Sequence, residues 1–99
     1  WMTTADEVPN PMDLQLTTRL NGDVVQNEST EQLFYSVPNI IAYVSQFTPL
    51  HPGDVIATGT PSGVGAGRKP PLWMKPGDRI EVEISGLGCL ANNVVAEDG

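Results

Sequence analysis

A loop of glycines and hydroxyl-bearing residues is the part of this chain whose composition is best suited to chemistry. It reads Thr58-Gly59-Thr60-Pro61-Ser62-Gly63 and follows the short apolar run Val55–Ala57. Glycine lets the backbone approach a ligand because it has no Cβ, and each hydroxyl can donate and accept a hydrogen bond. Thr60 could therefore donate to an oxyanion without supplying a charge. The alternative is that its hydroxyl satisfies only the backbone of its own loop.

One pair of carboxylates has a spacing that could hold a metal. Glu81 and Glu83 are separated by a single residue within the alternating run Arg79–Ile84. Alternate residues of a β-strand project to the same face, so both carboxylates could face one divalent cation. The same alternation is typical of a half-buried strand whose charged face is solvated. His51 is the single histidine, so a metal site built from several histidines is excluded by count.

The charge balance excludes some classes of partner. The net charge is −7, with only five basic residues. Nucleic acids and anionic membranes are bound by clusters of Lys and Arg, so neither is an expected partner. Arg68, Lys69 and Lys75 are interpreted as lining a surface loop, with a minor role near a carboxylate as the alternative. The glycine-rich loop also lacks the Gly-Lys-Ser/Thr sequence of a phosphate-binding P-loop.

The single cysteine and the hydropathy pattern indicate a compartment. Cys89 has no second cysteine with which to form an internal disulfide, which suits a reducing environment. We expect Cys89 to be a small buried hydrophobic side chain. No apolar run approaches the roughly 18 residues of a membrane-spanning helix. The expectation is a cytoplasmic protein without a membrane partner.

The first half of the chain predicts a hairpin and a helix. Leu14–Leu20 alternates over part of its length, and Asn21-Gly22 favours a type I′ turn that returns the chain through Val24–Gln26. The Ser-x-x-Gln pattern at Ser29–Gln32 predicts a short helical turn. Ser36 is expected to cap a helix that ends at Pro49. Its apolar stripe should pack against a sheet and comprises Ile40, Ile41, Val44 and Phe47.

The second half predicts three further strands. Val55–Ala57 reads as a strand that feeds the hydroxyl-rich loop. Arg79–Ile84 is the cleanest half-buried strand, and Gly86-Leu87-Gly88 turns it into Cys89–Ala96. With one main helix, the content is mainly β, which indicates a β-rich α+β fold.

Four of these segments together resemble the fumarylacetoacetate hydrolase family. The longest match is HPGDVIATGTPSGVGAG, residues 51–67, which is similar to the family's C-terminal signature. Asn21–Gln26 resembles its NGE-x-x-Q hairpin, and Leu33–Leu50 resembles its main helix. Lys75–Ile84 resembles its KPGD-containing strand. The similarity runs from about Thr4 to Glu97 and fits the acylpyruvase-like and 2-hydroxyhepta-2,4-diene-1,7-dioate isomerase-like branch best.

The resemblance implies a fold, a metal and a set of site residues. It implies that residues 1–99 are the C-terminal portion of a single catalytic domain, a mixed β-sandwich or roll, whose N-terminal part precedes Trp1. A divalent cation, Mg²⁺, Mn²⁺ or Ca²⁺, would be held by residues upstream of Trp1. Glu81 and Glu83 would then be a solvated face, with no metal ligand or catalytic group in this segment. Thr60 and Gly59 would bind the substrate, with Thr58 and Ser62 as weaker candidates.

The resemblance leaves the reaction open. It implies a metal-dependent hydrolase or decarboxylase of small oxo- or dioxo-acids such as acylpyruvates, acting as a homodimer. The alternative within the enzyme class is an isomerase or tautomerase of hydroxymuconate-type compounds in aromatic catabolism. The alternative from another class is a non-catalytic structural half that needs a separate N-terminal chain. On any of these readings we expect the 99 residues alone to be inactive.

Overall fold

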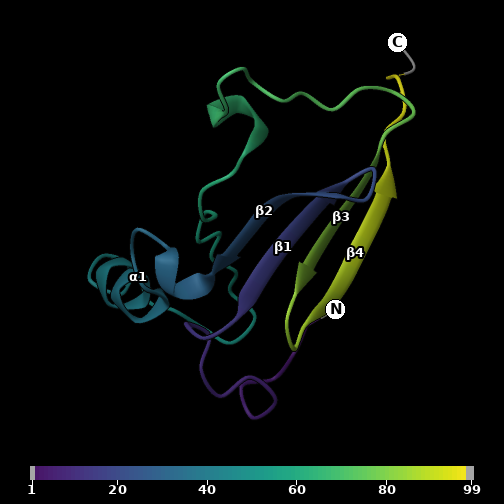
Figure 1. Ribbon diagram of the computed structural model, residues 1–99. Coiled ribbons are helices and arrows are strands. Elements are labelled where there is room, and N and C mark those ends of the chain that lie inside the picture. The colour runs from purple at the N-terminus through teal and green to yellow at the C-terminus, as the bar shows by residue number, and fades with distance from the viewer. Residues whose placement is uncertain (1, 98–99) are drawn as a thin grey trace.

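A four-stranded antiparallel sheet carries most of the regular structure (Figure 1). The computed structural model describes residues 2–97. The strands lie in the order β2-β1-β3-β4, and their bounds are β1 Gln15–Leu20, β2 Asp23–Ser29, β3 Arg79–Ile84 and β4 Gly88–Asn93. Together with a single α-helix, this sheet confirms the β-rich α+β fold expected from the sequence.

The turn between β1 and β2 has the predicted geometry. Asn21 and Gly22 have φ angles of 53° and 87°, and a type I′ turn requires positive φ at both positions. The same turn is tied to the start of β3. The Asn21 side-chain carbonyl accepts a hydrogen bond from the Arg79 N–H at 2.8 Å, and its amide donates to Asp78 at 2.9 Å.

One irregularity interrupts the pairing of β1 with β2. Thr18 pairs with Gln26, but the next residue, Arg19, pairs with Val24. Val25 is therefore the extra residue of a β-bulge in an edge strand. Because a bulge removes a residue from the ladder, the backbone of Val25 is available to other parts of the chain.

The two faces of the sheet differ in chemistry because side chains alternate along each strand. The register places one largely apolar set together: Leu16, Thr18, Leu20, Ile80, Val82, Ile84 and Leu90. The opposite face is polar and carries Thr17, Arg19, Glu81, Glu83 and Cys89. Gln26 pairs with Thr18 and so lies on the first, apolar face.

The helix begins where the sequence predicts and ends earlier. Helix α1 spans Val37–Val44, and the Ser36 side chain caps it by accepting a hydrogen bond from the Asn39 N–H at 3.2 Å. The prediction that it runs to Pro49 is wrong, because turns follow from Ser45 onward. The short helical turn is confirmed as η1, Thr30–Gln32, capped by Ser29.

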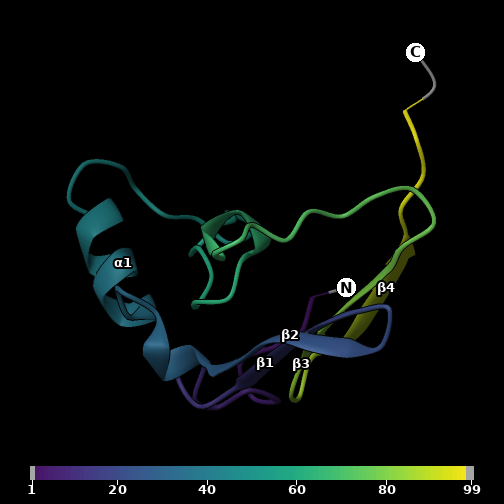
Figure 2. The same cartoon turned by 45° about the horizontal axis from the view of Figure 1, so that its top comes forward.

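The helix stands apart from the sheet in both views (Figures 1 and 2). None of its residues is buried: Ile41 is 45% exposed, and Phe47, which lies beyond the end of the helix, is 68% exposed. The expectation that the apolar stripe packs against a sheet is therefore not met by the sheet of this chain.

A long connection leads from α1 back to β3. It contains the short 3-10 helix η2, Gly65–Gly67. The predicted strand Val55–Ala57 is wrong, since these residues form no strand in the described part of the chain. Val55 is 93% exposed. An isolated apolar run has β propensity, but a strand exists only where a neighbouring strand accepts and donates its backbone hydrogen bonds.

The described residues include no buried hydrophobic side chain. The two buried polar side chains are Gln26, 9% exposed, and Asp78, 6% exposed. Both are held by hydrogen bonds between segments far apart in sequence. The best-shielded points of this chain are thus polar contacts beside β2 and at the turn before β3.

Candidate functional site

The hydroxyl-rich loop lies against the edge strand β2, on the apolar face of the sheet. Figure 2 shows the teal-to-green connection above one side of the sheet. Gln26 of β2 makes the central contact. Its side-chain Nε2 donates to Thr60 Oγ1 at 2.9 Å and to the Pro61 carbonyl at 2.8 Å. Thr18 Oγ1 donates to Gln26 Oε1 at 2.8 Å.

Thr60 itself remains exposed while its neighbour Pro61 is buried. The loop is thus anchored at its centre through a residue, Thr60, that is itself exposed. Gly59, directly before it, has a φ of 82° and is also exposed. An accessible hydroxyl beside a glycine in the left-handed region is an arrangement that can meet an oxygen of a small anion. The structure therefore brings the two predicted substrate-binding residues to one exposed point.

A second set of contacts fixes the end of the loop to the bulge. Arg68 Nη2 donates to the Val25 carbonyl, and Arg68 Nε donates to the Gly63 carbonyl at 3.4 Å. Gly63, with a φ of 108°, lies so close to β2 that a Cβ there would be 3.0 Å from the Val25 oxygen. The backbone freed by the bulge is thus used to bind the loop.

The weaker candidates are placed differently. Ser62 Oγ donates to Glu28 of β2 at 3.5 Å, and Thr58 Oγ1 donates to the adjacent Gly59 carbonyl at 3.2 Å. Both hydroxyls are therefore engaged as donors within the chain. An apolar hollow of about 250 Å³ adjoins the loop, lined in part by Gly63, Leu72 and Trp73. Thr60 does not line this hollow.

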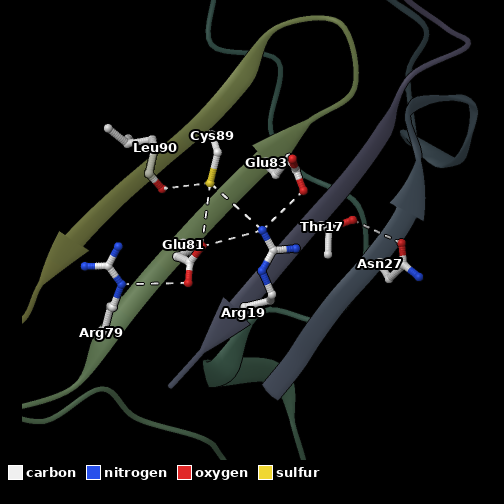
Figure 3. A network of polar contacts seen from close by, with 8 residues as sticks. All are labelled: Thr17, Arg19, Asn27, Arg79, Glu81, Glu83, Cys89 and Leu90. Atoms are coloured by element: carbon white, nitrogen blue, oxygen red, sulfur yellow. Dashed lines mark hydrogen bonds and ion pairs between the residues drawn. The ribbon is translucent and has the colours of Figure 1, made fainter. Parts of the chain in front are cut away.

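Glu81 and Glu83 lie on the other face of the sheet (Figure 3). Arg19 of β1 lies between them, with Nη2 at 3.6 Å from Glu81 Oε2 and 3.2 Å from Glu83 Oε1. Arg79 approaches Glu81 at 3.8 Å. The hydrogen bond to Glu83, with the charges of both glutamates, holds the pKa of Arg19 above its usual value. Two guanidinium groups, those of Arg19 and Arg79, already pair with these carboxylates, so the carboxylates do not fit a metal site.

Cys89 joins this polar face. Its sulfur lies 3.8 Å from Glu81 Oε2 and 3.9 Å from Arg19 Nη2 (Figure 3). The expectation of a buried hydrophobic cysteine is wrong: Cys89 is exposed. It lies on an edge strand, and the register points its side chain to the charged face rather than to the apolar one.

Two features are absent from residues 2–97. No group of three or more His, Cys, Asp or Glu side chains in that range could hold a metal ion. No helix there is long and apolar enough to cross a bilayer.

Sequence reasoning missed two residues that shape the loop. Gln26 was part of a recognised hairpin motif, but its contact with Thr60 joins residues 34 positions apart. Its signal is a glutamine at a strand position on the largely apolar face of the sheet. The sequence predicts Arg68 to be a surface cation, yet it is half-buried and donates hydrogen bonds to the backbone carbonyls of Gly63 and Val25. Nothing in its local sequence distinguishes it from Lys69.

Comparison with known proteins places the chain in one protein family. Residues 1–95 match the family described as Fumarylacetoacetate (FAA) hydrolase C-terminal. The human mitochondrial protein named oxaloacetate tautomerase FAHD2B is 48% identical over 94 residues, which cover 95% of this chain and 30% of that protein.

Solved structures agree with this comparison. Maleylpyruvate hydrolase from Sphingobium sp. SYK-6, in complex with manganese(II) and pyruvate, is 42% identical with a TM-score of 0.81, over 96% of this chain and 33% of that one. The 2-hydroxyhepta-2,4-diene-1,7-dioate isomerase from Mycobacterium marinum is 39% identical with a TM-score of 0.74, over 91% and 33%. The chain thus spans about a third of the length of these relatives.

Proposed function

The chain belongs to the fumarylacetoacetate hydrolase family, and from this premise we propose that its protein is a divalent-cation-dependent enzyme. The proposed substrates are small oxo- or dioxo-acids of the acylpyruvate type, cleaved at a C–C bond. Residues 1–99 would form the C-terminal portion of its single catalytic domain. The proposal extends beyond the matched third of the relatives, so it concerns the complete protein.

The observation that carries the proposal is the exposed, anchored Thr60 hydroxyl. A substrate carboxylate or oxo oxygen needs donors that are held in place before the ligand arrives. Gln26 and the buried Pro61 hold the loop, while Thr60 and Gly59 stay accessible. A relative with 42% identity was crystallised with pyruvate, a small 2-oxo acid.

The cation in this proposal is held by residues other than Glu81 and Glu83. Those two lie on the face of the sheet opposite Gln26 and are paired with Arg19. A ligand held by Thr60 would therefore be separated from them by the sheet. Within this chain, the part left to Thr60 and Gly59 is binding and orienting the anionic end of the substrate.

The test uses the complete protein stripped of metal with a chelator. We expect the protein to hydrolyse an acylpyruvate again when Mn²⁺, Mg²⁺ or Ca²⁺ is added. The reaction is monitored through the loss of the substrate's ultraviolet absorbance. Pyruvate should appear as a product in equal amount. Absence of turnover for a panel of acylpyruvates with every cation would contradict the hydrolase proposal.

A tautomerase or isomerase is the second candidate, favoured by the 48% identity to a protein named oxaloacetate tautomerase. Such an enzyme moves a proton without breaking a C–C bond. Proton NMR of oxaloacetate with the metal-loaded protein separates the two candidates. Tautomerisation raises the rate at which the keto and enol forms interconvert and breaks no C–C bond of the substrate. If neither reaction is accelerated, the remaining alternative is a structural half that requires a separate chain.

A further inference from the structure

The side chain of Gln26 is only 9% exposed, and both of its polar atoms are hydrogen-bonded. Its two amide hydrogens go to Thr60 Oγ1 and the Pro61 carbonyl, and its Oε1 accepts from Thr18. A neutral amide carries two donors and one acceptor oxygen, so this pattern uses both donors. A buried amide satisfied in this way has one preferred orientation.

That orientation is determined by Pro61. A backbone carbonyl can only accept, so the atom of Gln26 that faces it must be the nitrogen. The same nitrogen lies 2.9 Å from Thr60 Oγ1. An amide nitrogen cannot accept, and the Thr60 oxygen must therefore be the acceptor in this contact. Its own hydrogen is directed elsewhere, and among residues 2–97 it meets no acceptor.

We propose that Gln26 is a positioning residue that fixes Thr60 as a hydrogen-bond donor toward an anionic ligand oxygen. This inference rests on the proposed function, since it assigns the ligand oxygen to a small 2-oxo acid. Without Gln26, the Thr60 hydroxyl can donate into its own loop, as the Thr58 hydroxyl does to Gly59. Thr18 acts one step further back, by holding Gln26 Oε1.

A role that is merely structural makes a different prediction. If Gln26 only fastens the loop to β2, its loss should weaken ligand binding whether or not Thr60 has a hydroxyl. If it acts through the Thr60 hydroxyl, its loss should matter only while that hydroxyl is present. A double-mutant cycle separates the two because it measures the coupling between the residues.

The experiment measures pyruvate binding to the complete, Mn²⁺-loaded protein by isothermal titration. Thr60→Val and Gln26→Met should each weaken pyruvate binding about 10-fold, the low end for a hydrogen bond to a charged group. The double variant should bind within about 2-fold of Thr60→Val alone. Additive losses, or an unchanged Gln26→Met variant, would overturn the proposal.

Arg68→Met is the matched comparison for loop anchoring. It removes a different attachment of the loop to β2 without touching Thr60. Any loss of affinity that it causes should add to that of Thr60→Val. Thr60→Ser keeps a hydroxyl, so Gln26→Met should again weaken pyruvate binding when it is combined with Thr60→Ser. If Gln26→Met has no effect in that background, the result counts against a role through the hydroxyl.

A ligand-free measurement keeps the inference separate from the proposed function. If the wild-type protein binds no pyruvate, the proposed function fails, and the Gln26 contact is judged by NMR. The Gln26 side-chain amide hydrogens should exchange slowly with solvent in the wild type and faster in Thr60→Val. Fast exchange in the wild type would overturn the positioning role even if pyruvate binds.

Discussion

At the scale of single residues, an accessible hydroxyl is combined with a shielded partner. Thr60 is exposed, whereas Gln26, which donates to it, is 9% exposed. Burial matters for the partner because a shielded amide that lost its acceptors would remain unsatisfied at a cost of about 1–3 kcal/mol. The loop therefore has a strong reason to stay on β2, while Thr60 as a whole remains exposed.

Replacing Thr60 tests the residue on which the proposed function depends. In the complete enzyme, Thr60→Val should lower kcat/KM about 10²-fold or more, the scale for removing one oxyanion donor. Ser62→Ala should cost less, because the Ser62 hydroxyl points to Glu28 instead. Steady-state kinetics on the acylpyruvate panel provide the measurement. Equal kcat/KM for wild type and Thr60→Val would remove Thr60 from the site.

The Glu81–Glu83 pair gives a prediction about metal. Because Arg19 and Arg79 already pair with these carboxylates, Glu83→Gln in the complete protein should leave its Mn²⁺ affinity within about 2-fold of the wild type. Residues 1–99 alone should bind Mg²⁺ or Mn²⁺ no better than an ordinary acidic surface. Both affinities are measured by isothermal titration. Micromolar binding by the 99-residue chain that disappears in Glu83→Ala would contradict this prediction.

Asp78 predicts a dependence of stability on pH. Hydrogen bonds from the Asn21 side-chain amide and the Lys75 backbone N–H lower the pKa of Asp78. A carboxyl whose pKa is lower in the folded state contributes stability above its unfolded pKa, about 3.9, and loses it as pH falls through the folded pKa. The free energy of unfolding of the wild type should therefore exceed that of the Asp78→Asn variant by a constant amount above about pH 5. Below about pH 4 the difference between the two proteins should be smaller.

Urea denaturation of the complete protein over a pH series measures this difference. Asp54 closes a similar Pro-Gly-Asp turn but is exposed and contacts His51. Asp54→Asn is thus the matched control and should show a smaller effect. A difference between wild type and Asp78→Asn that does not change with pH would show that the Asp78 carboxylate is not favoured by folding.

At the scale of elements, the bulged edge strand β2 is the platform for the loop. Gln26, Glu28 and the Val25 carbonyl each hold a different point of residues 58–68. Bulges at sheet edges commonly redirect backbone or side chains next to functional sites. Here the extra residue lies immediately before Gln26, so the irregularity and the loop anchor are adjacent in sequence.

Gly63→Ala tests the close approach of loop and strand. Both Gly63 and Gly59 have positive φ, so alanine at either position is strained by the backbone. Only at Gly63 would the new Cβ also meet Val25 at 3.0 Å and Gln26 at 3.2 Å, while at Gly59 nothing lies within 4 Å. We expect Gly63→Ala to lower the melting temperature of the complete protein by several degrees more than Gly59→Ala. Equal shifts in differential scanning calorimetry would show that packing against β2 adds nothing.

At the scale of the whole molecule, the chain exposes too much surface for its size. Its accessible area is 7556 Å², whereas a folded monomer of this mass exposes about 5500 Å². The radius of gyration is 15.8 Å, compared with about 13 Å for a domain of this length. The exposed apolar side chains include Leu90 on the apolar face of the sheet and Ile41 on α1. We infer that these surfaces are covered in the complete protein.

The 99 residues made alone should therefore fold poorly. Exposed apolar patches and unpaired strand edges favour association, so we expect a poorly soluble or molten species despite the charge of −7. The complete protein should be an ordered dimer. Light scattering and near-UV circular dichroism of both proteins decide this. A sharp cooperative melt from a monodisperse, monomeric 99-residue chain would contradict the inferred domain boundary.

Several features of fold and site were predictable because they are encoded in neighbouring residues. The Asn21-Gly22 turn, the Ser36 cap and the alternation of Arg79–Ile84 all follow from local backbone preference or side-chain periodicity. The end of α1 and the strand expected at Val55–Ala57 were wrong, because those features depend on packing or pairing with other segments.

The sequence by itself determined the family, the hairpin turns and the hydroxyl-rich loop, since each is a property of contiguous residues. Only the tertiary structure decided that Gln26 reaches Thr60 and that Glu81 lies on the opposite side of the sheet. The register of β1 with β2 places Gln26 on the face that the loop covers, and the register of β1 with β3 places Glu81 on the other face, because a register assigns each side chain to one face. Such a register joins strands that a long connection separates, and no local pattern specifies it.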